Sequence, residues 1–287
     1  MSKYIIMTDA ASDLTNELLC DEDLAMIQLD VLVEGEAPAA NCDVDIKEFY
    51  EKLRGKRGAT TSAVNVDTFI NSFKKYLKEG IDVLYLGFSS GLSGTYNAGF
   101  VAANELSEKY PDRKIYTVDT LAASLGEGLL VYYAMQMKKA GADIESVKSF
   151  VEDNKLKLCH WFTVDDLFFL KRGGRVSAAT AVVGTMLSIK PVLHVDDKGR
   201  LISMGKARGR KAAIDELLNK MKETAIEPER QTVFISHGDA LEDAEYLAER
   251  VKLELGVRDV KIGYIGPVIG AHSGPGTLAL FFMGDKR

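Results

Sequence analysis

Residues 81–95 read IDVLYLGFSSGLSGT, and this stretch decides the fold. Its first eight residues are mostly apolar and predict a buried strand, whereas residues 95–110 have the spacing of a helix. A loop rich in glycine and serine lies between them. Ligands of open α/β sheets bind at the carboxyl ends of the strands. Glycines let the backbone approach a ligand closely, and the free N–H groups at a helix start favour an anion. The loop therefore predicts a binding site for a negatively charged group.

The alternation of strand and helix continues on both sides of this stretch. Residues 4–8 and 114–119 predict two more buried strands, and helical spacing covers residues 45–54, 69–77 and 124–140. Strands that alternate with helices indicate a parallel sheet covered on both faces.

The pattern changes from about residue 158. Residues 189–195 and 200–206 predict two strands around the turn Asp196-Asp197-Lys198-Gly199, which indicates an antiparallel hairpin. Helices over residues 209–224 and 240–255 and strands over residues 232–236, 260–265 and 277–283 complete this half. We therefore expect an α/β protein of two domains, an α/β/α domain over residues 1–155 and an α+β domain over residues 156–287.

Residues 87–91 also match the G-x-S-x-G pattern of serine hydrolases in a strand–turn–helix context. Ser89 would be the nucleophile, and Asp119 or Asp165 with His237 or His272 would supply the order Ser…Asp…His. In a nucleophile elbow the helix begins directly after the serine, whereas here the loop continues to Gly94. A serine hydrolase of acyl esters that uses Ser89 and His272 is the alternative interpretation.

Other segments carry polar groups that ordinary capping does not fully explain. Thr60-Thr61-Ser62 precedes a helix, and capping accounts for one of its hydroxyls. Arg175 follows two glycines and could fork onto a carboxylate or phosphate. His272 lies in residues 265–277, where four glycines and two prolines predict a rigid loop. The nearly uncharged residues 177–188 predict either a buried helix or a cavity wall.

Composition excludes several classes of function. The 36 Lys+Arg and 42 Asp+Glu residues give a net charge of −6, which does not suit a nucleic-acid binder. The three cysteines lack C-x-x-C spacing, and the phosphate-loop, dinucleotide and H-E-x-x-H motifs are absent, so we expect no metal or cofactor. No apolar run approaches the about 18 residues that span a bilayer. With no signal-peptide pattern, we expect a cytoplasmic protein without stable membrane insertion.

Taken in order, the polar segments resemble those of the DegV family of bacterial fatty-acid-binding proteins. The resemblance runs nearly from one end of the chain to the other. Each motif alone is weak evidence for the family, whereas all of them in this order are specific for it. The motifs are Thr8-Asp9, Ser12-Asp13, Thr61-Ser62, residues 89–96 (SSGLSGTY), Val164-Asp165-Asp166-Leu167, Gly173-Gly174-Arg175-Val176, Ile189-Lys190-Pro191, residues 265–270 (IGPVIG), His272 and Gly274-Pro275-Gly276.

The resemblance implies an α/β/α domain of parallel strands and an α+β domain that closes over a long-chain fatty acid such as palmitate. It implies that Thr61 and Ser93 hold the carboxylate, and that residues 178–187 line the tail. The other residues implied around the head group are Ser62, Ser90, Gly94, Arg175 and His272. Such a protein would be a carrier and not an enzyme, would need no cofactor, and would transport the lipid or present it to a fatty acid kinase. The family often has Gln-Pro after its Thr-Ser pair, whereas this chain has Ala63-Val64, which bears on the shape of that loop.

Overall fold

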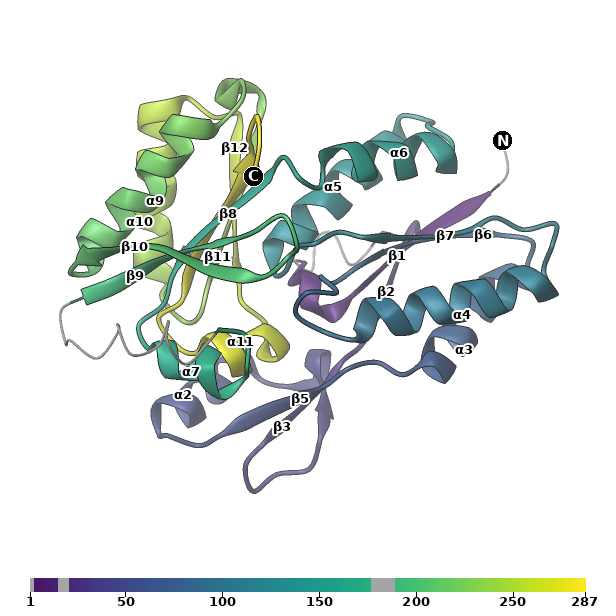
Figure 1. Ribbon diagram of the computed structural model, residues 1–287, viewed down its shortest axis with the longest axis horizontal. Coiled ribbons are helices and arrows are strands. Elements are labelled where there is room, and N and C mark those ends of the chain that lie inside the picture. The colour runs from purple at the N-terminus through teal and green to yellow at the C-terminus, as the bar shows by residue number, and fades with distance from the viewer. Residues whose placement is uncertain (1–2, 15–20, 177–188) are drawn as a thin grey trace.

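The computed structural model describes residues 3–14, 21–176 and 189–287, and Figure 1 shows their arrangement. In this part of the chain, a four-stranded parallel sheet has β1 (Tyr4–Asp9) and β6 (Asp82–Gly87) at its centre. β2 (Leu24–Ile27) and β7 (Ile115–Asp119) are its edges. β1 and β6 are buried along their whole length, as expected for strands covered on both faces. The predicted parallel sheet is confirmed, with β2 as an unpredicted edge strand.

Helices cover both faces of the parallel sheet. α3 (Val66–Leu77) and α4 (Thr95–Lys109) lie on one face, and α5 (Leu125–Lys139) and α6 (Ile144–Asn154) lie on the other (Figure 1). The Asn65 and Asp143 side chains cap α3 and α6 by accepting N–H groups of the first turn. Phe69 meets Phe73 edge to face within α3, and its edge-to-face contact with Tyr85 joins α3 to β6.

A six-stranded mixed sheet forms the second half of the described chain. Its strands lie in the order β10 (Leu201–Arg208), β9 (Ile189–Val195), β8 (Leu158–Thr163), β13 (Leu278–Met283), β11 (Thr232–His237) and β12 (Asp259–Tyr264). All neighbours are antiparallel except β11 and β12, so the predicted β9–β10 hairpin is confirmed. α9 (Arg210–Thr224) and α10 (Leu241–Leu255) cover one face. α5 packs on the other face, so one apolar core joins both large sheets.

A small antiparallel sheet, which the sequence did not predict, carries one of the polar segments. It contains β4 (Ala39–Ala40), β3 (Asp30–Val33) and β5 (Ala59–Ser62), with Val31 opposite Thr61. α2 (Ile46–Arg54) and α11 (Pro267–Ser273) pack beside this sheet around Phe49. The prediction of a rigid loop over residues 265–277 is wrong over α11, because Pro267 at the first position favours a helix. The helix ends at Gly274, whose φ of 78° favours glycine.

Short elements complete the fold: α7 (Leu167–Arg172), η1 (Ala10–Ser12), η2 (Asn41–Asp43) and η3 (Pro228–Arg230). The apolar segment over residues 177–188, which was predicted to be a buried helix or a cavity wall, lies outside the described residues. Within the described residues, no helix has the length and apolar character needed to cross a bilayer.

Candidate functional site

The loop over residues 88–94, called here the hydroxyl loop, is held in shape by a buried aspartate. One carboxylate oxygen of Asp9, at the end of β1, accepts the Tyr85 hydroxyl at 2.7 Å and the Phe88 N–H at 3.0 Å. The other oxygen accepts the Ala11 N–H at 3.1 Å. Burial raises the pKa of Asp9, and the three donors oppose that rise because they stabilise the carboxylate. Asp9 therefore fixes where the hydroxyl loop leaves the parallel sheet.

The Ser89 side chain is fully buried and joins the hydroxyl loop to the β9–β10 hairpin. Its hydroxyl donates to the Gly199 carbonyl at 2.9 Å and accepts the Gly91 N–H at 3.2 Å. A Cβ on Gly91 would lie 2.5 Å from the Lys198 carbonyl oxygen. The close approach of the hydroxyl loop to the hairpin therefore requires glycine at position 91. The Ser89 hydroxyl thus donates its hydrogen bond to a backbone carbonyl. Among the described contacts, Ser89 does not form the hydrogen bond with His272 that a serine hydrolase needs.

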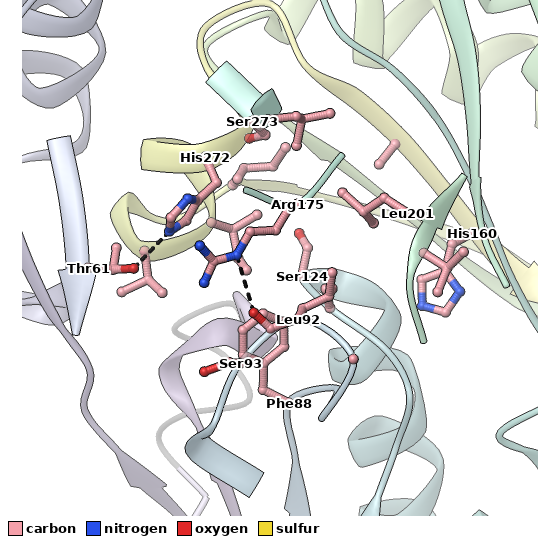
Figure 2. Close-up of a pocket in the computed structure, with 18 of the residues that line it drawn as sticks. Thr61, Phe88, Leu92, Ser93, Ser124, His160, Arg175, Leu201, His272 and Ser273 are labelled. Carbon is pink, nitrogen blue, oxygen red and sulfur yellow. Dashed lines mark hydrogen bonds between the residues drawn. The ribbon is translucent and has the colours of Figure 1, made fainter. Parts of the chain in front are cut away.

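Thr61 and His272 come from distant segments and meet at one point (Figure 2). β5 presents Thr61 and α11 presents His272, with Thr61 Oγ1 2.7 Å from His272 Nε2. Burial, followed by the positive charges of Arg175 and Arg172, lowers the pKa of His272 to about 4. The imidazole is therefore neutral at pH 7. Its Nδ1 has no hydrogen-bond partner within the described part of the chain.

Ser93 lies two residues before the start of α4, close to the segment that carries Thr61. Its hydroxyl lies 3.0 Å from Thr95 Oγ1 and accepts the Thr95 N–H at 3.2 Å. Thr95 Oγ1 in turn accepts the Val64 N–H at 3.3 Å. A proline at position 64 would have no N–H to donate, so Val64 allows a hydrogen bond between the segment after β5 and the first residue of α4 that a proline would not.

Arg175 reaches the same place from the turn that follows α7. Its Nε donates to the Leu92 carbonyl at 3.2 Å, and its Nη1 donates to the Gly173 carbonyl. Figure 2 shows the guanidinium between His272 and Leu92. Burial lowers the pKa of Arg175, but a guanidinium stays charged in proteins. The site therefore combines a cation with hydroxyl groups and a neutral imidazole.

These groups border a cavity of about 420 Å³, a volume typical of small-molecule sites. Every residue predicted for the site lines this cavity: Thr61, Ser62, Ser90, Ser93, Gly94, Arg175 and His272. Ser62, Ser90 and Gly94 are exposed, so they mark its mouth. Much of the remaining wall is apolar. Phe162, Leu201 and Phe281 come from the mixed sheet, Phe88 from the hydroxyl loop, and Leu170 and Val268 from α7 and α11.

Asp13 positions α11, a role that the sequence did not predict. Its carboxylate accepts the Ser124 hydroxyl at 2.6 Å and the Gly266 N–H at 2.9 Å. Burial raises the pKa of Asp13 to about 7, although both hydrogen bonds lower it. Because Gly266 directly precedes α11, Asp13 fixes the start of the helix that carries His272. The one signal in the sequence was the Ser12-Asp13 pair after the first strand. Ser124, Ser236 and His160 also line the cavity and were not predicted.

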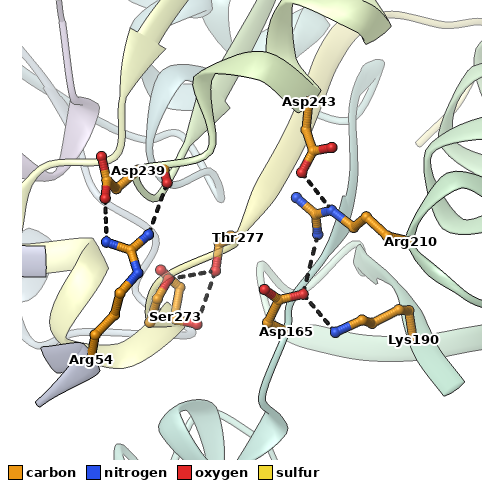
Figure 3. Close-up of polar contacts among 9 residues, drawn as sticks. Arg54, Asp165, Lys190, Arg210, Asp239, Asp243, Ser273 and Thr277 are labelled. Carbon is orange, nitrogen blue, oxygen red and sulfur yellow. Dashed lines mark hydrogen bonds and ion pairs between the residues drawn. The ribbon is translucent and has the colours of Figure 1, made fainter. Parts of the chain in front are cut away.

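Asp165, a candidate third member of the hydrolase triad, takes part in a different network (Figure 3). It lies 2.6 Å from Lys190 Nζ and 3.7 Å from Arg210 Nη1, and Arg210 Nε donates to Asp243 at 2.8 Å. A Cβ on Gly276 would lie 2.0 Å from Asp165 Oδ2, so the carboxylate packs tightly against the segment between α11 and β13. Asp165 therefore pairs with Lys190 and Arg210, and among the described contacts it does not orient His272.

The described residues contain no group of three or more His, Cys, Asp or Glu side chains that could hold a metal ion. Cys42 and Cys159 are free thiols. The groups that the structure gathers at the cavity are hydroxyls, an imidazole and a guanidinium beside an apolar wall, and groups of these kinds can bind an anion.

Fold and site together define an α/β binding protein whose apolar cavity opens beside hydroxyls, an imidazole and a guanidinium. The family model described as "Uncharacterised protein, DegV family" matches residues 3–285. The chain belongs to the DegV family.

Relatives and solved structures agree with this family over the full chain. A DegV domain-containing protein from Clostridium perfringens is 49% identical, with coverage of 100% of this chain and 99% of that protein. The structure of a DegV family protein from Thermus thermophilus, described by its fatty acid binding, is similar with a TM-score of 0.89 and 32% identity. The match covers 98% of this chain and 99% of that one. DegV from Bacillus subtilis, described as a fatty acid binding protein, matches with a TM-score of 0.85 and 27% identity over 99% of this chain and 100% of that one.

Proposed function

We propose that this chain binds a long-chain fatty acid, with the hydrocarbon tail in the cavity and the carboxylate at the mouth. The observation that carries the proposal is an apolar cavity of about 420 Å³ with Thr61, Ser93, Arg175 and His272 gathered at its edge. The relatives from Thermus thermophilus and Bacillus subtilis are described as binding fatty acids, which supports the same class of ligand.

The energetics suit an apolar chain with one charged end. At about 0.8 kcal/mol per buried CH₂, fifteen methylenes contribute roughly 12 kcal/mol before the costs of association and ordering. A partly buried carboxylate needs hydrogen bonds to offset its desolvation. If His272 Nε2–H donates to Thr61 Oγ1, the Thr61 proton is free to donate to the carboxylate, and the neutral imidazole orients that hydroxyl. Ser93 would donate a second hydrogen bond, and Arg175 would supply the opposite charge.

Replacement of both hydroxyls tests the proposal. We expect Thr61→Ala with Ser93→Ala to weaken palmitate binding by roughly 100-fold or more, because each of the two lost hydrogen bonds to a charged group is worth about 1.5–3 kcal/mol. Binding of hexadecane, which has no carboxylate, should change by less than about threefold, since the tail contacts are kept. Thr60→Ala is the matched control, because Thr60 is exposed and adjacent residues of a strand face opposite sides. Calorimetry on the delipidated protein gives both affinities, and equal losses for palmitate and hexadecane would refute the assignment.

Mass spectrometry of lipids extracted from the denatured protein tests the ligand class directly. A co-purified or added long-chain acid in stoichiometric amount is expected. Absence of both would end the proposal. The hydrolase alternative predicts that a fluorophosphonate probe labels Ser89, whereas the buried bond from Ser89 to Gly199 predicts no labelling.

We further propose that residues 1–155 and 156–287 act as two domains around the acid, and that the chain is a cytoplasmic carrier without catalysis of its own. The exposed residues Ser62, Ser90 and Gly94 would leave the head group accessible while the tail stays enclosed. Such an arrangement suits presentation of the carboxylate to a fatty acid kinase. With a bacterial fatty acid kinase and ATP, the palmitate-loaded protein should yield acyl phosphate, and free palmitate should not. Equal turnover of free palmitate would contradict the carrier role.

A further inference from the structure

One arginine after β13 connects segments from both halves of the fold. The backbone around Arg287 is fixed to the segment that leads into β8. The Gly284 N–H donates to the Lys157 carbonyl at 2.7 Å, and the Arg287 N–H donates to the Leu156 carbonyl at 2.8 Å. Figure 1 shows this end of the chain beside β8. The Arg287 side chain therefore starts from a fixed point in the mixed-sheet half.

The guanidinium of Arg287 donates to backbone carbonyls of four separate segments. Its Nε donates to Leu158, the first residue of β8, at 3.0 Å. Its Nη1 donates to Leu121, after β7, at 2.9 Å and to Asp196, in the β9–β10 turn, at 3.0 Å. Its Nη2 donates to Lys155, at the end of α6. One side chain thus satisfies four main-chain acceptors that are distant in the sequence.

These four contacts cross the boundary between the two halves. Leu121 and Lys155 belong to the parallel-sheet half, whereas Leu158 and Asp196 belong to the mixed-sheet half. Burial lowers the pKa of Arg287 to about 10, so the group stays charged at pH 7. A charged donor makes stronger hydrogen bonds than a neutral one, and the planar guanidinium holds five N–H donors in a fixed fork. Arg287 therefore ties the two halves together at one point.

The β9–β10 hairpin, which Arg287 holds by its turn, forms part of the cavity wall. Val195 and Leu201 face each other on either side of the turn, and both line the cavity. β10 is an edge strand, and among the described residues β9 pairs with β8 through two residue pairs. The position of the turn therefore depends strongly on the contacts that tie it to the rest of the fold.

The same turn packs against the hydroxyl loop beside the mouth of the cavity. The Ser89 hydroxyl donates to the Gly199 carbonyl at 2.9 Å, and a Cβ on Gly199 would lie 2.1 Å from that oxygen. The neighbouring residues Ser90 and Gly91 line the cavity. Movement of the turn away from the parallel-sheet half would thus separate the hairpin from the hydroxyl loop and widen the cavity at that side.

We infer that Arg287 is a clamp that holds the β9–β10 turn against the parallel-sheet half, and that release of this clamp admits and discharges the fatty acid. The inference rests on the proposed function, since it concerns how the same acid enters and leaves. The groups proposed to hold the carboxylate, Thr61, Ser93 and His272, make none of the described contacts with Arg287. The clamp can therefore open while the carboxylate site stays assembled.

A clamp of this kind has a kinetic signature. Its bonds join protein to protein, so their loss destabilises the closed form equally with and without the acid. Entry and exit then accelerate by the same factor, and the affinity, which is the ratio of the two rates, stays unchanged. Damage to the binding site would instead weaken the affinity, chiefly through faster release.

The test uses Arg287→Met, which removes the guanidinium and keeps an unbranched side chain. Release of radiolabelled palmitate to excess albumin gives the exit rate, calorimetry on the delipidated protein gives Kd, and their ratio gives the entry rate. We expect both rates to rise roughly tenfold or more, where tenfold corresponds to about 1.4 kcal/mol, while Kd changes by less than about threefold. Arg258→Met is the matched control, because Arg258 donates to Thr232 Oγ1 at 2.9 Å and does not line the cavity.

The inference is overturned if release from Arg287→Met is unchanged, if release rises only in step with a loss of affinity, or if Arg258→Met releases palmitate equally fast. If Arg287→Met does not fold, Arg287→Lys decides the question, because a single ammonium keeps the charge but cannot span four carbonyls. Both rates should then rise together by a smaller factor, and unchanged rates would contradict the clamp. Failure of the proposed function has a different signature, because then the unaltered protein binds no palmitate.

Discussion

The neutral state of His272 makes a quantitative prediction about stability and pH. In the folded protein, burial and the charges of Arg175 and Arg172 lower the pKa of His272 to about 4. In the unfolded chain its pKa is about 6.5. As the pH falls from about 6.5 to 4, the unfolded chain gains a proton on this residue and the folded protein does not. Stability must therefore be lost as the pH falls through this window, and none is lost above it.

The magnitude follows from the two pKa values. At about pH 4.5, proton binding to His272 raises the statistical weight of the unfolded chain about a hundredfold and that of the folded protein only slightly. The free energy of unfolding is therefore about 2.5 kcal/mol lower at this pH than at about pH 7.5. Other groups titrate in the same range. Asp13, with its pKa raised to about 7, acts in the opposite direction, because its carboxyl group holds a proton in the folded protein that the unfolded chain has lost. Total stability against pH is therefore not informative, and a difference between two proteins is needed.

The assay is urea unfolding of the delipidated protein and of His272→Gln, each at about pH 7.5 and about pH 4.5. The glutamine amide can keep a hydrogen bond to Thr61 but cannot titrate, and all other groups are shared. Relative to the unaltered protein, the variant should gain about 2.5 kcal/mol on going from the higher to the lower pH. A stability gap between the two proteins that is the same at both pH values would refute the neutral, buried histidine.

Two further predictions concern the supports of the site. Tyr85→Phe removes the buried hydroxyl that donates to a carboxylate at 2.7 Å, and should lower the free energy of unfolding in urea by about 2 kcal/mol. Tyr116→Phe, which removes a longer and partly exposed bond of 3.3 Å, should cost less than about 1 kcal/mol, and equal losses would contradict the role of the buried donor. Gly173→Ala places a Cβ 2.2 Å from His272 Nδ1 and should weaken palmitate binding by roughly tenfold or more. At Gly174 a Cβ would meet no described atom within 4 Å, so calorimetry should find the palmitate affinity of Gly174→Ala unchanged. The positive φ at this position should still lower the stability of that variant by about 1 kcal/mol.

The sequence predicts the large elements because their hydrophobic patterns are long and clearly bounded. β6 is apolar from Val83 to Leu86 and ends at Gly87, and the β9–β10 hairpin surrounds an evident turn. The sequence does not predict β5, because Ala59–Ser62 is too short and too polar for a hydrophobic pattern to appear. It places a loop where α11 lies, since glycine and proline in a seven-residue helix resemble a turn.

The residues that gather at the cavity can be predicted because hydroxyls cluster in two short segments and the ordered motifs resemble one family. The supports cannot be predicted, because they join residues far apart in the chain. Asp9 and Tyr85 are separated by 76 residues, and Asp13 and Gly266 by 253. Only the folded chain brings each acid to its donors.

The polarity of the cavity wall depends on strand register, for which this sequence offers no signal. On β8, His160 and Phe162 line the cavity, whereas Trp161 between them packs with the core under α9 and α10. This alternation follows from the pairing of β8 with β13, in which His160 lies opposite Phe281. A shift of one residue would place Trp161 toward the cavity and His160 in the apolar core. Register therefore determines which side chains of β8 face the cavity, and the packing of both faces of the mixed sheet sets that register, which no short sequence motif reveals.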